Sequence, residues 1–209
     1  MDSVISLVEL GGPVVAILGV VSVLALAVII WKFIQFIVLR VGSKSRAERA
    51  VSQWHSGRRE EAFQYASRGR SITARRVTDA MSMLADGRSR DVIEERLIRR
   101  ATNDLHNLQS GFRFLDAVAQ LSPLLGLFGT VLGMIEAFRE LQAAGSSVDP
   151  SILAGGIWVA LLTTAAGLAV AMPVSLFLTW MESRIEDERV AIETLTSDIL
   201  ASEAELKAA

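Results

Sequence analysis

The chain has no cysteine and only two histidines among its 209 residues. Disulfide bonds and thiolate chemistry are therefore excluded, and His55 and His106 stand far apart with no neighbouring pattern of metal ligands. The sequence also lacks the motifs of hydrolases, kinases, nucleotide-binding loops and metal centres. We expect a protein that is not an enzyme and that holds no metal and no organic cofactor.

Charge is missing from three stretches of the chain. Residues 14–31, 117–135 and 157–178 contain no Asp, Glu, Lys, Arg or His, in a sequence with 51% hydrophobic residues. About 20 apolar residues are needed to cross the ~30 Å hydrocarbon core of a bilayer. We therefore predict an all-α membrane protein with three transmembrane helices. Asp2 and Glu9 take the place of a basic leader, which favours a retained anchor over a cleaved secretory signal.

Positive charge is missing from two segments that flank these stretches. Residues 1–13 and 142–151 have no Lys or Arg, whereas residues 32–113 hold seventeen of the twenty-one. The positive-inside rule then places the amino terminus outside and both the long middle segment and the carboxyl terminus in the cytoplasm. Acidic residues are interspersed with the basic ones, which favours a solvated face near the membrane over nucleic-acid binding.

The predicted organisation follows from these spans. An amphipathic lead-in at the outer face ends at the helix-breaking sequence Gly11-Gly12-Pro13, and the soluble parts are expected to be helical. The segments are 1–12 for the lead-in, 13–39 for the first transmembrane helix, 40–112 for a cytoplasmic helical region, 113–141 for the second transmembrane helix, 142–151 for an outer loop, 152–181 for the third transmembrane helix and 182–209 for a cytoplasmic helical tail.

The second and third transmembrane helices are expected to extend far into the cytoplasm. Apolar residues keep a helical period from residue 92 onward and no proline intervenes before Pro123, so we predict one helix from 92 to about 140, ~70 Å long. Beyond the third span a heptad stripe predicts a helical stalk, which packs against residues 92–112 of its own chain, against an identical subunit, or against both. The stripe consists of Ile185, Ile192, Ile199 and Leu206, with Leu195 between them.

Small residues form a stripe along the second span and another along the third. Five positions recur with the same spacing in each stripe, and a threonine stands in the middle of both. Such narrow faces let helix backbones come close together in lipid, or line a tight shared space. The stripes are Ser122, Gly126, Thr130, Gly133 and Ala137, and Gly156, Ala160, Thr164, Gly167 and Ala171.

The two central threonines are the candidate functional residues. Thr130 and Thr164 are predicted to lie ~8 and ~10 Å below the outer edges of their spans, which is a similar depth. If both stripes face one space, their hydroxyls form a polar layer, to which Thr163 adds a third from a neighbouring face. Many membrane threonines bond only to their own helix carbonyls, but the matched pair favours a function. Asp116 and Glu136 are candidate ends of a pathway, or simply solvated charges at the membrane surface.

A missing carboxylate limits the mechanism. Moving a proton or a metal ion through hydrocarbon usually involves an ionisable group, and the three spans contain none. Either the protein moves no ions, or another chain supplies the carboxylate between the threonine stripes.

Two stretches closely resemble the signature of the ExbB/TolQ/MotA proton-channel family. They are residues 123–134, PLLGLFGTVLGM, and residues 156–173, GIWVALLTTAAGLAVAMP, and the three-span plan is most similar to the ExbB/TolQ branch. The resemblance implies a homopentamer in the bacterial inner membrane, with a periplasmic amino terminus and a periplasmic 142–151 loop. Its second and third helices would surround a single-span ExbD/TolR-like partner, whose aspartate carries the proton past Thr130 and Thr164.

The same resemblance implies that the proton gradient energises work at the periplasm or outer membrane, through a TonB- or TolA-like protein. A sodium-driven member of the family and a non-conducting membrane scaffold are the alternatives. Family members often have a glutamate five positions before the third-helix threonine, where this chain has Val159. That difference leaves the ion and its entry route open.

Overall fold

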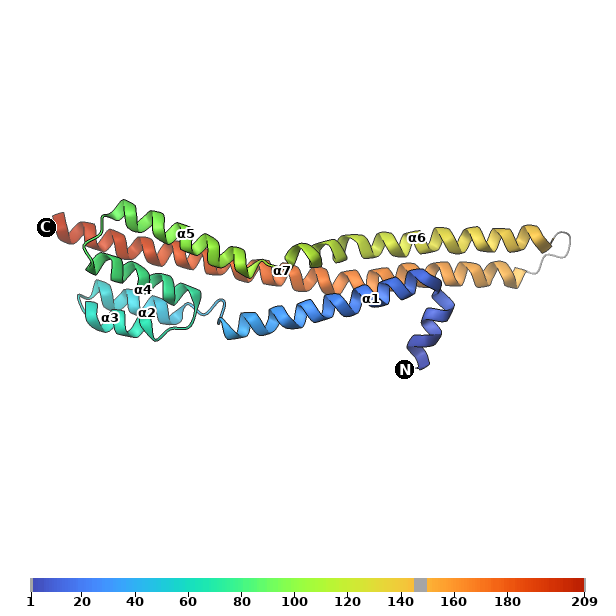
Figure 1. Cartoon of the computed structure of the whole chain (residues 1–209), viewed down its shortest axis with the longest axis horizontal. Helices are drawn as coiled ribbons and strands as arrows, with labels where there is room; N and C mark the ends of the chain where they lie inside the picture. The colour runs from blue at the N-terminus through green and yellow to red at the C-terminus, as the bar shows by residue number, and fades with distance from the viewer. Residues whose placement is uncertain (1, 145–149, 209) are drawn as a thin grey trace. The chain divides into compact units, whose positions relative to one another are not determined.

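The computed structural model describes residues 2–144 and 150–208, and every regular element in this part of the chain is a helix. The all-α prediction is confirmed. The helices are α1 (Asp2–Val38), α2 (Ser45–His55), α3 (Arg59–Ser67), α4 (Ile72–Ala85), α5 (Arg90–Leu108), α6 (Phe112–Ala144) and α7 (Pro150–Ala208) (Figure 1).

The chain divides into two compact units. Met1–Trp31 and Gly111–Thr179 form the first, which we call the span unit. Lys32–Ser110 and Trp180–Ala209 form the second, the bundle unit. Both units therefore combine segments that are far apart in the sequence.

Three helices are long and apolar enough to cross a membrane, which confirms that prediction. They are Gly12–Val38, Phe112–Ala143 and a longer stretch of α7, Leu153–Ser202. α1 is interrupted at Gly12, whose φ of 64° is open mainly to glycine, and Pro13 follows. The expected break before the first span is therefore present. The side chains of residues 2–11, which would form the amphipathic face, and residues 145–149 of the outer loop lie outside the described residues.

The first span buries little of its own surface within the span unit. Leu18 and Ala25 are each 1% exposed, but Val20 and Val23 remain 63% and 66% exposed. This helix has no stripe of small residues and presents its large aliphatic side chains outward. An exposed apolar surface of this extent needs lipid or another chain to cover it.

The helix predicted from residue 92 to about 140 is interrupted, so this prediction was wrong. α5 ends at Leu108 and α6 begins at Phe112. Between them Gly111 adopts a φ of 83°, a left-handed conformation that glycine reaches without the steric cost of a side chain. Residues 92–122 contain no proline, but the pair Ser110-Gly111 is typical of turns and helix ends and explains the interruption.

Lys32 is buried at the end of α5. Its side chain is fully covered, and its Nζ donates hydrogen bonds to Leu108 O at 3.1 Å, Ser110 Oγ at 2.9 Å and Gln35 Oε1 at 2.7 Å. Leu108 is the last residue of α5, and its carbonyl has no partner within the helix. A cation at this position also interacts favourably with the negative end of the helix dipole. Lys32 thus stabilises the point at which α5 ends.

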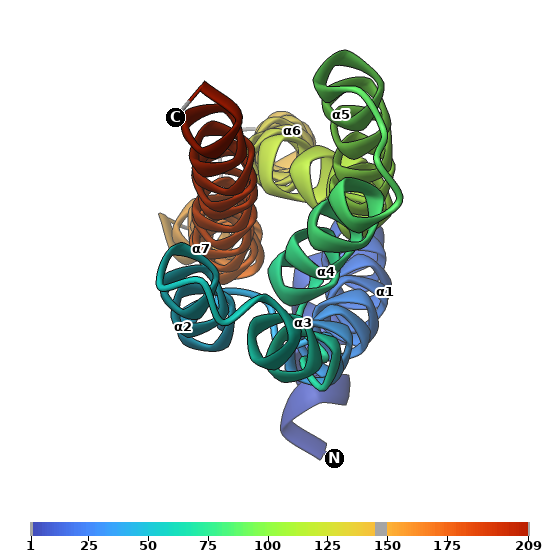
Figure 2. The same ribbon diagram turned by 90° about the vertical axis from the view of Figure 1, so that its left-hand side faces the viewer.

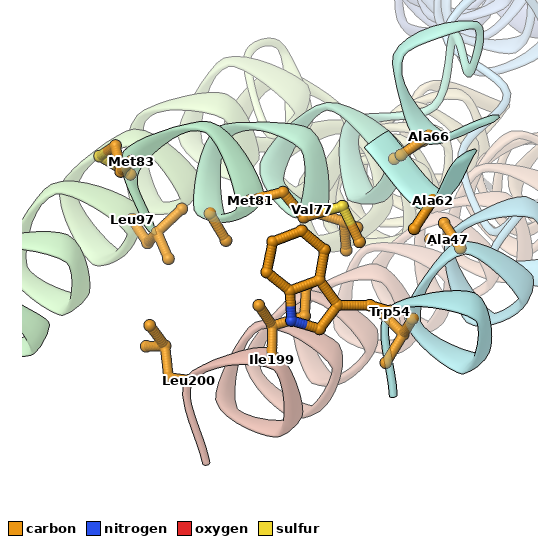
Figure 3. Packing of buried hydrophobic residues seen from close by; sticks show 14 of the residues in the cluster. Ala47, Trp54, Ala62, Ala66, Val77, Met81, Met83, Leu97, Ile199 and Leu200 are labelled. Carbon is orange, nitrogen blue, oxygen red and sulfur yellow. The ribbon is translucent and has the colours of Figure 1, made fainter. Parts of the chain in front are cut away.

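The bundle unit has its own hydrophobic core. α2 packs on α3 and α4, and α4 packs on both α3 and α5 (Figure 2). Alanines at these contacts let the helices approach closely, and the Trp54 ring lies between Val77 and Met81 of α4 and Ile199 of α7 (Figure 3). The buried core residues are Ala47, Ala50, Val51, Trp54, Ala62, Ala66, Ala74, Val77, Ala80, Met81, Met83, Ile93, Leu97, Ile199 and Leu200.

The heptad stripe of α7 faces its own chain. α7 continues without interruption beyond the third span, which confirms the predicted helical continuation. Ile199 belongs to the core, while Ile185 and Ile192 are buried and line a groove of about 510 Å³ whose other wall is α5. Packing within the chain is therefore observed, whereas contact with an identical subunit stays a prediction. The side chain of Leu206 lies outside the described residues.

Glu188 connects three segments of the bundle unit. It is 1% exposed, and its Oε1 accepts hydrogen bonds from the backbone N–H of Thr73 at 2.9 Å and from Thr73 Oγ1 at 2.6 Å. Its Oε2 accepts one from the N–H of Gly42 at 2.6 Å. Thr73 lies in the first turn of α4, where N–H groups lack helix partners and a carboxylate is favourable. Glu188 therefore joins α7 to the start of α4 and to the turn after α1.

We expect Glu188→Ala to lower the free energy of unfolding by about 2–4 kcal/mol, because hydrogen bonds to a charged group are lost and buried N–H donors lose their acceptor. Glu186→Ala is the matched control, since Glu186 lies on the same helix with its side chain 64% exposed. It should change stability by less than about 0.5 kcal/mol. Thermal unfolding of the full chain in detergent, followed by circular dichroism, measures both variants. Equal unfolding midpoints would contradict the connecting role of Glu188.

Candidate ion pathway

α6 and the first half of α7 run antiparallel within the span unit, and their small residues face each other (Figure 1). A Cβ added at Gly133 would lie 3.3 Å from the Cβ of Ala160, and one at Gly156 would collide with the Cβ of Ala137. A Cβ at Gly167 would lie 3.1 Å from the Cα of Gly126. We call this contact the seam. It consists of the ten residues of the two predicted stripes together with Gly129 and Thr163, since a Cβ at Gly129 would lie 2.7 Å from the Thr163 side chain.

Most of the seam residues are covered by the packing of α6 on α7. Ser122, Ala137, Ala160 and Ala171 are at most 6% exposed. Gly126 and Gly167 are also buried, whereas Thr130, Gly133, Gly156 and Thr164 are partly exposed. The sequence left two alternatives for the stripes, close approach of the helices and the lining of a shared space. Close approach is observed in the single chain. That the stripes also face a pore stays a prediction.

The three threonines differ in their surroundings. Thr163 is 2% exposed, and its Oγ1 donates to Ala160 O at 2.7 Å in its own helix and to Gly126 O at 3.1 Å across the seam. Thr164 Oγ1 lies 3.4 Å from the same Gly126 carbonyl. Thr130 Oγ1 donates to Leu127 O in its own helix at 2.7 Å. Thr163 thus joins the helices, while Thr130 and Thr164 lie on the partly exposed part of the seam.

The register of the seam places the threonines at one level. Gly133 faces Ala160 and Gly126 faces Gly167, so the position opposite Thr130 on an antiparallel helix is Thr163. Thr164 is one residue further along, a displacement of about 1.5 Å. The hydroxyls of α6 and α7 therefore occur within one narrow layer of the span unit, whereas their depth in a membrane stays a prediction.

The candidate ends of the pathway carry solvated charges. Asp116 is exposed near the start of α6. The Glu136 carboxylate is 65% exposed and lies 3.8 Å from Arg139, whose side chain is 73% exposed. Ion pairs with this exposure contribute little to stability. Roles for Asp116 and Glu136 in ion movement stay predictions.

The chemistry of the seam is limited to hydroxyl and carbonyl oxygens. Such groups hydrogen-bond water or a protonated carboxyl group, but they do not titrate near neutral pH. Across residues 2–144 and 150–208 there is no cluster of three or more His, Asp or Glu side chains that could hold a metal ion. A titrating group in this layer would have to come from another chain.

The sequence profile described as the MotA/TolQ/ExbB proton channel family matches residues 68–194, more than half of the chain. The chain belongs to this family. The matched region contains α6, the part of α7 that forms the seam and all three threonines, so the resemblance noted from residues 123–134 and 156–173 is confirmed. With three helices able to span a bilayer, this member of the family is a membrane protein.

Individual relatives carry ExbB names. The chain is 52% identical over 68 residues to the biopolymer transport protein exbB1 of Vibrio cholerae, a match that covers 32% of this chain and 30% of the relative. It is 37% identical over 108 residues to a biopolymer transport protein ExbB homolog of Methanothermobacter thermautotrophicus, covering 52% and 38%. With an ExbB-like 1 biopolymer transport protein of Helicobacter pylori it shares 29% over 157 residues, covering 67% and 82%. The chain thus spans about a third of the length of the first two relatives.

The seam predicts opposite effects for two glycine-to-alanine changes. In Gly126→Ala the new Cβ would lie 2.8 Å from the backbone oxygen of Thr163, so the helices must separate, and we expect a loss of about 1–3 kcal/mol in stability. Gly155→Ala is the matched control on α7, because its Cβ meets nothing within 4 Å. Alanine favours the helix there, so stability should be unchanged or rise by up to about 1 kcal/mol. Thermal unfolding in one detergent compares them, and a stabilised Gly126→Ala would contradict the close packing.

Proposed function

We propose that this chain is the multispan subunit of a proton-driven energiser in the bacterial inner membrane, with a periplasmic amino terminus and a cytoplasmic carboxyl terminus. It forms a homopentamer around a single-span ExbD/TolR-like partner. The complex uses the proton gradient to do work at the periplasm or outer membrane through a TonB- or TolA-like protein. The observation that carries this proposal is the family match over two helices whose stretches 117–135 and 157–178 are uncharged and whose threonine hydroxyls lie at one level.

The absence of ionisable groups from residues 117–135 and 157–178 supports a partner that brings its own carboxyl group. A protonated carboxyl group is neutral and crosses an apolar layer at low cost, whereas an ionised one stays where water and hydrogen-bond donors reach it. Thr130 and Thr164, on the partly exposed part of the seam, offer such hydroxyls to a neighbouring helix. Alternation between the two protonation states then couples ion movement to movement of the partner.

The exposed apolar surface supports assembly in the bilayer. Val23 of α1 and Leu176 of α7 are 66% and 74% exposed in the single chain. Residues of this kind cover most of the three spans and are suited to lipid or to neighbouring copies. The subunit number of five rests on the family resemblance.

We expect Thr130→Ala and Thr164→Ala each to lower proton flux at least tenfold in liposomes that contain the chain with its single-span partner, because a carboxyl group loses a hydrogen-bonding hydroxyl. Thr179→Ala is the matched control: Thr179 is an exposed residue of α7 whose hydroxyl donates only to Ser175 O of its own helix. Full flux in both seam variants, with normal assembly, would contradict the role of the threonines.

The same liposomes separate the alternatives. The close packing of α6 on α7 is by itself a sufficient reason for the small residues, and this observation favours a non-conducting scaffold. For a scaffold, adding the partner would give no proton flux above the leak of empty vesicles. A sodium-driven subunit would give flux that follows a sodium gradient and persists without a proton gradient.

A further inference from the structure

One hydroxyl in the seam has no hydrogen bond. Ser122 of α6 is 1% exposed, and its Oγ contacts no donor or acceptor among the residues that the structure describes. By contrast, the buried Thr163 donates to Ala160 O. A buried hydroxyl without a partner is unfavourable and is rare in folded proteins, and the usual explanation is an ordered water or an ion. Alanine would fill the same position without that cost.

The backbone beside Ser122 also has a carbonyl that lacks its usual helix donor. Pro123 lies inside α6 and has no N–H, so the helix supplies no donor to the carbonyl of Ala119, four residues earlier. α7 approaches this turn at backbone distance, because a Cβ at Gly167 would lie 2.5 Å from Ser122 O. A hydroxyl with unused hydrogen-bonding capacity and a carbonyl without a helix donor therefore occur within one turn of α6. Two such groups supply the smallest number of polar partners that a buried water needs.

Ser122 lies on the same stripe of α6 as Thr130. It is eight residues before Thr130, or ~12 Å along the helix axis, and Gly126 is halfway between them. The Gly126 carbonyl is the group that Thr163 and Thr164 approach. Polar atoms therefore recur at every turn along one line of α6, in a segment that otherwise consists of apolar side chains.

We propose that the seam binds a water molecule at Ser122 and that Ser122 is a positioning residue of the ion pathway, one step inward from the threonine layer. The relay role rests on the function proposed above. The serine hydroxyl stays intact and orients the water by hydrogen bonding, so that a proton delivered at the threonines continues through water to the inner side.

The first experiment tests whether water is present at Ser122, and it does not depend on proton flux. The chain has no cysteine, so Ser122→Cys introduces a single thiol, and a small water-soluble methanethiosulfonate is applied to the full-length protein in liposomes without any partner. Thiols in apolar surroundings stay protonated and react slowly. Ala25→Cys is the matched control, since Ala25 of α1 is 1% exposed, as Ser122 is, and lies outside the seam. We expect Ser122→Cys to react at least tenfold faster, and equal rates would overturn the water site.

The relay role is tested by separating flux from stability. Ser122→Ala should lower partner-dependent proton flux at least fivefold while the unfolding midpoint changes little, because the hydroxyl bonds to the water and to no other part of the described chain. Ser22→Ala changes a partly exposed serine of α1 whose hydroxyl donates to Gly19 O, and it should keep full flux. Full flux in Ser122→Ala, with low flux in Thr130→Ala, would overturn the relay role and leave the proposed function standing. If the unmodified chain conducts nothing with its partner, the proposed function and the relay fail together, while the thiol rates still decide whether water is present.

Discussion

The close approach of α6 and α7 determines what the span unit can do. Glycine and alanine bring the two backbones near enough for Thr163 to reach the carbonyl of Gly126 in the other helix. The same proximity leaves no room between the helices for a long ionisable side chain. Hydroxyl and carbonyl oxygens are therefore the polar groups of the seam. The small residues thus determine both how closely the helices pack and which polar groups lie between them. Under the proposed function a guest helix carries the charge, whereas a looser pair of helices could carry its own.

The bundle unit, unlike the seam, contains buried charged side chains. Lys32 and Glu188 are both fully or almost fully buried, and each lies at the helix end that complements its sign. The ammonium group is at the carboxyl end of α5, and the carboxylate is at the amino end of α4. Helix ends within a folded unit have backbone groups without helix partners, and a charged side chain satisfies several of them at once. Buried charge in this unit stabilises helix ends, which a core made of alanines cannot do.

The sequence was sufficient for features that depend on spacing along one helix. It predicted the three helices able to span a membrane, the two stripes of the seam and the common level of Thr130 and Thr164, because composition and the helical period determine them. It was insufficient for contacts between distant segments: the partners of Glu188 are 146 and 115 residues away. A charged residue at a heptad position between Ile185 and Ile192 was nevertheless a signal that could have been used. The sequence predicts Ser122 only as a small residue of the stripe, because no sequence pattern shows whether a hydroxyl has a hydrogen-bond partner.

The core of the bundle unit is completed only when the end of α7 has been synthesised. Most of its core comes from residues 45–101, but Glu188, Ile199 and Leu200 are added by the end of α7. At synthesis rates of about 5–20 residues per second, roughly 5–20 s pass between the two contributions. During that interval Trp54 and the surrounding alanines lack their final neighbours, while the ribosome is still delivering α6 and α7. The nascent chain therefore exposes an unfinished core, which is the kind of surface that chaperones and proteases recognise.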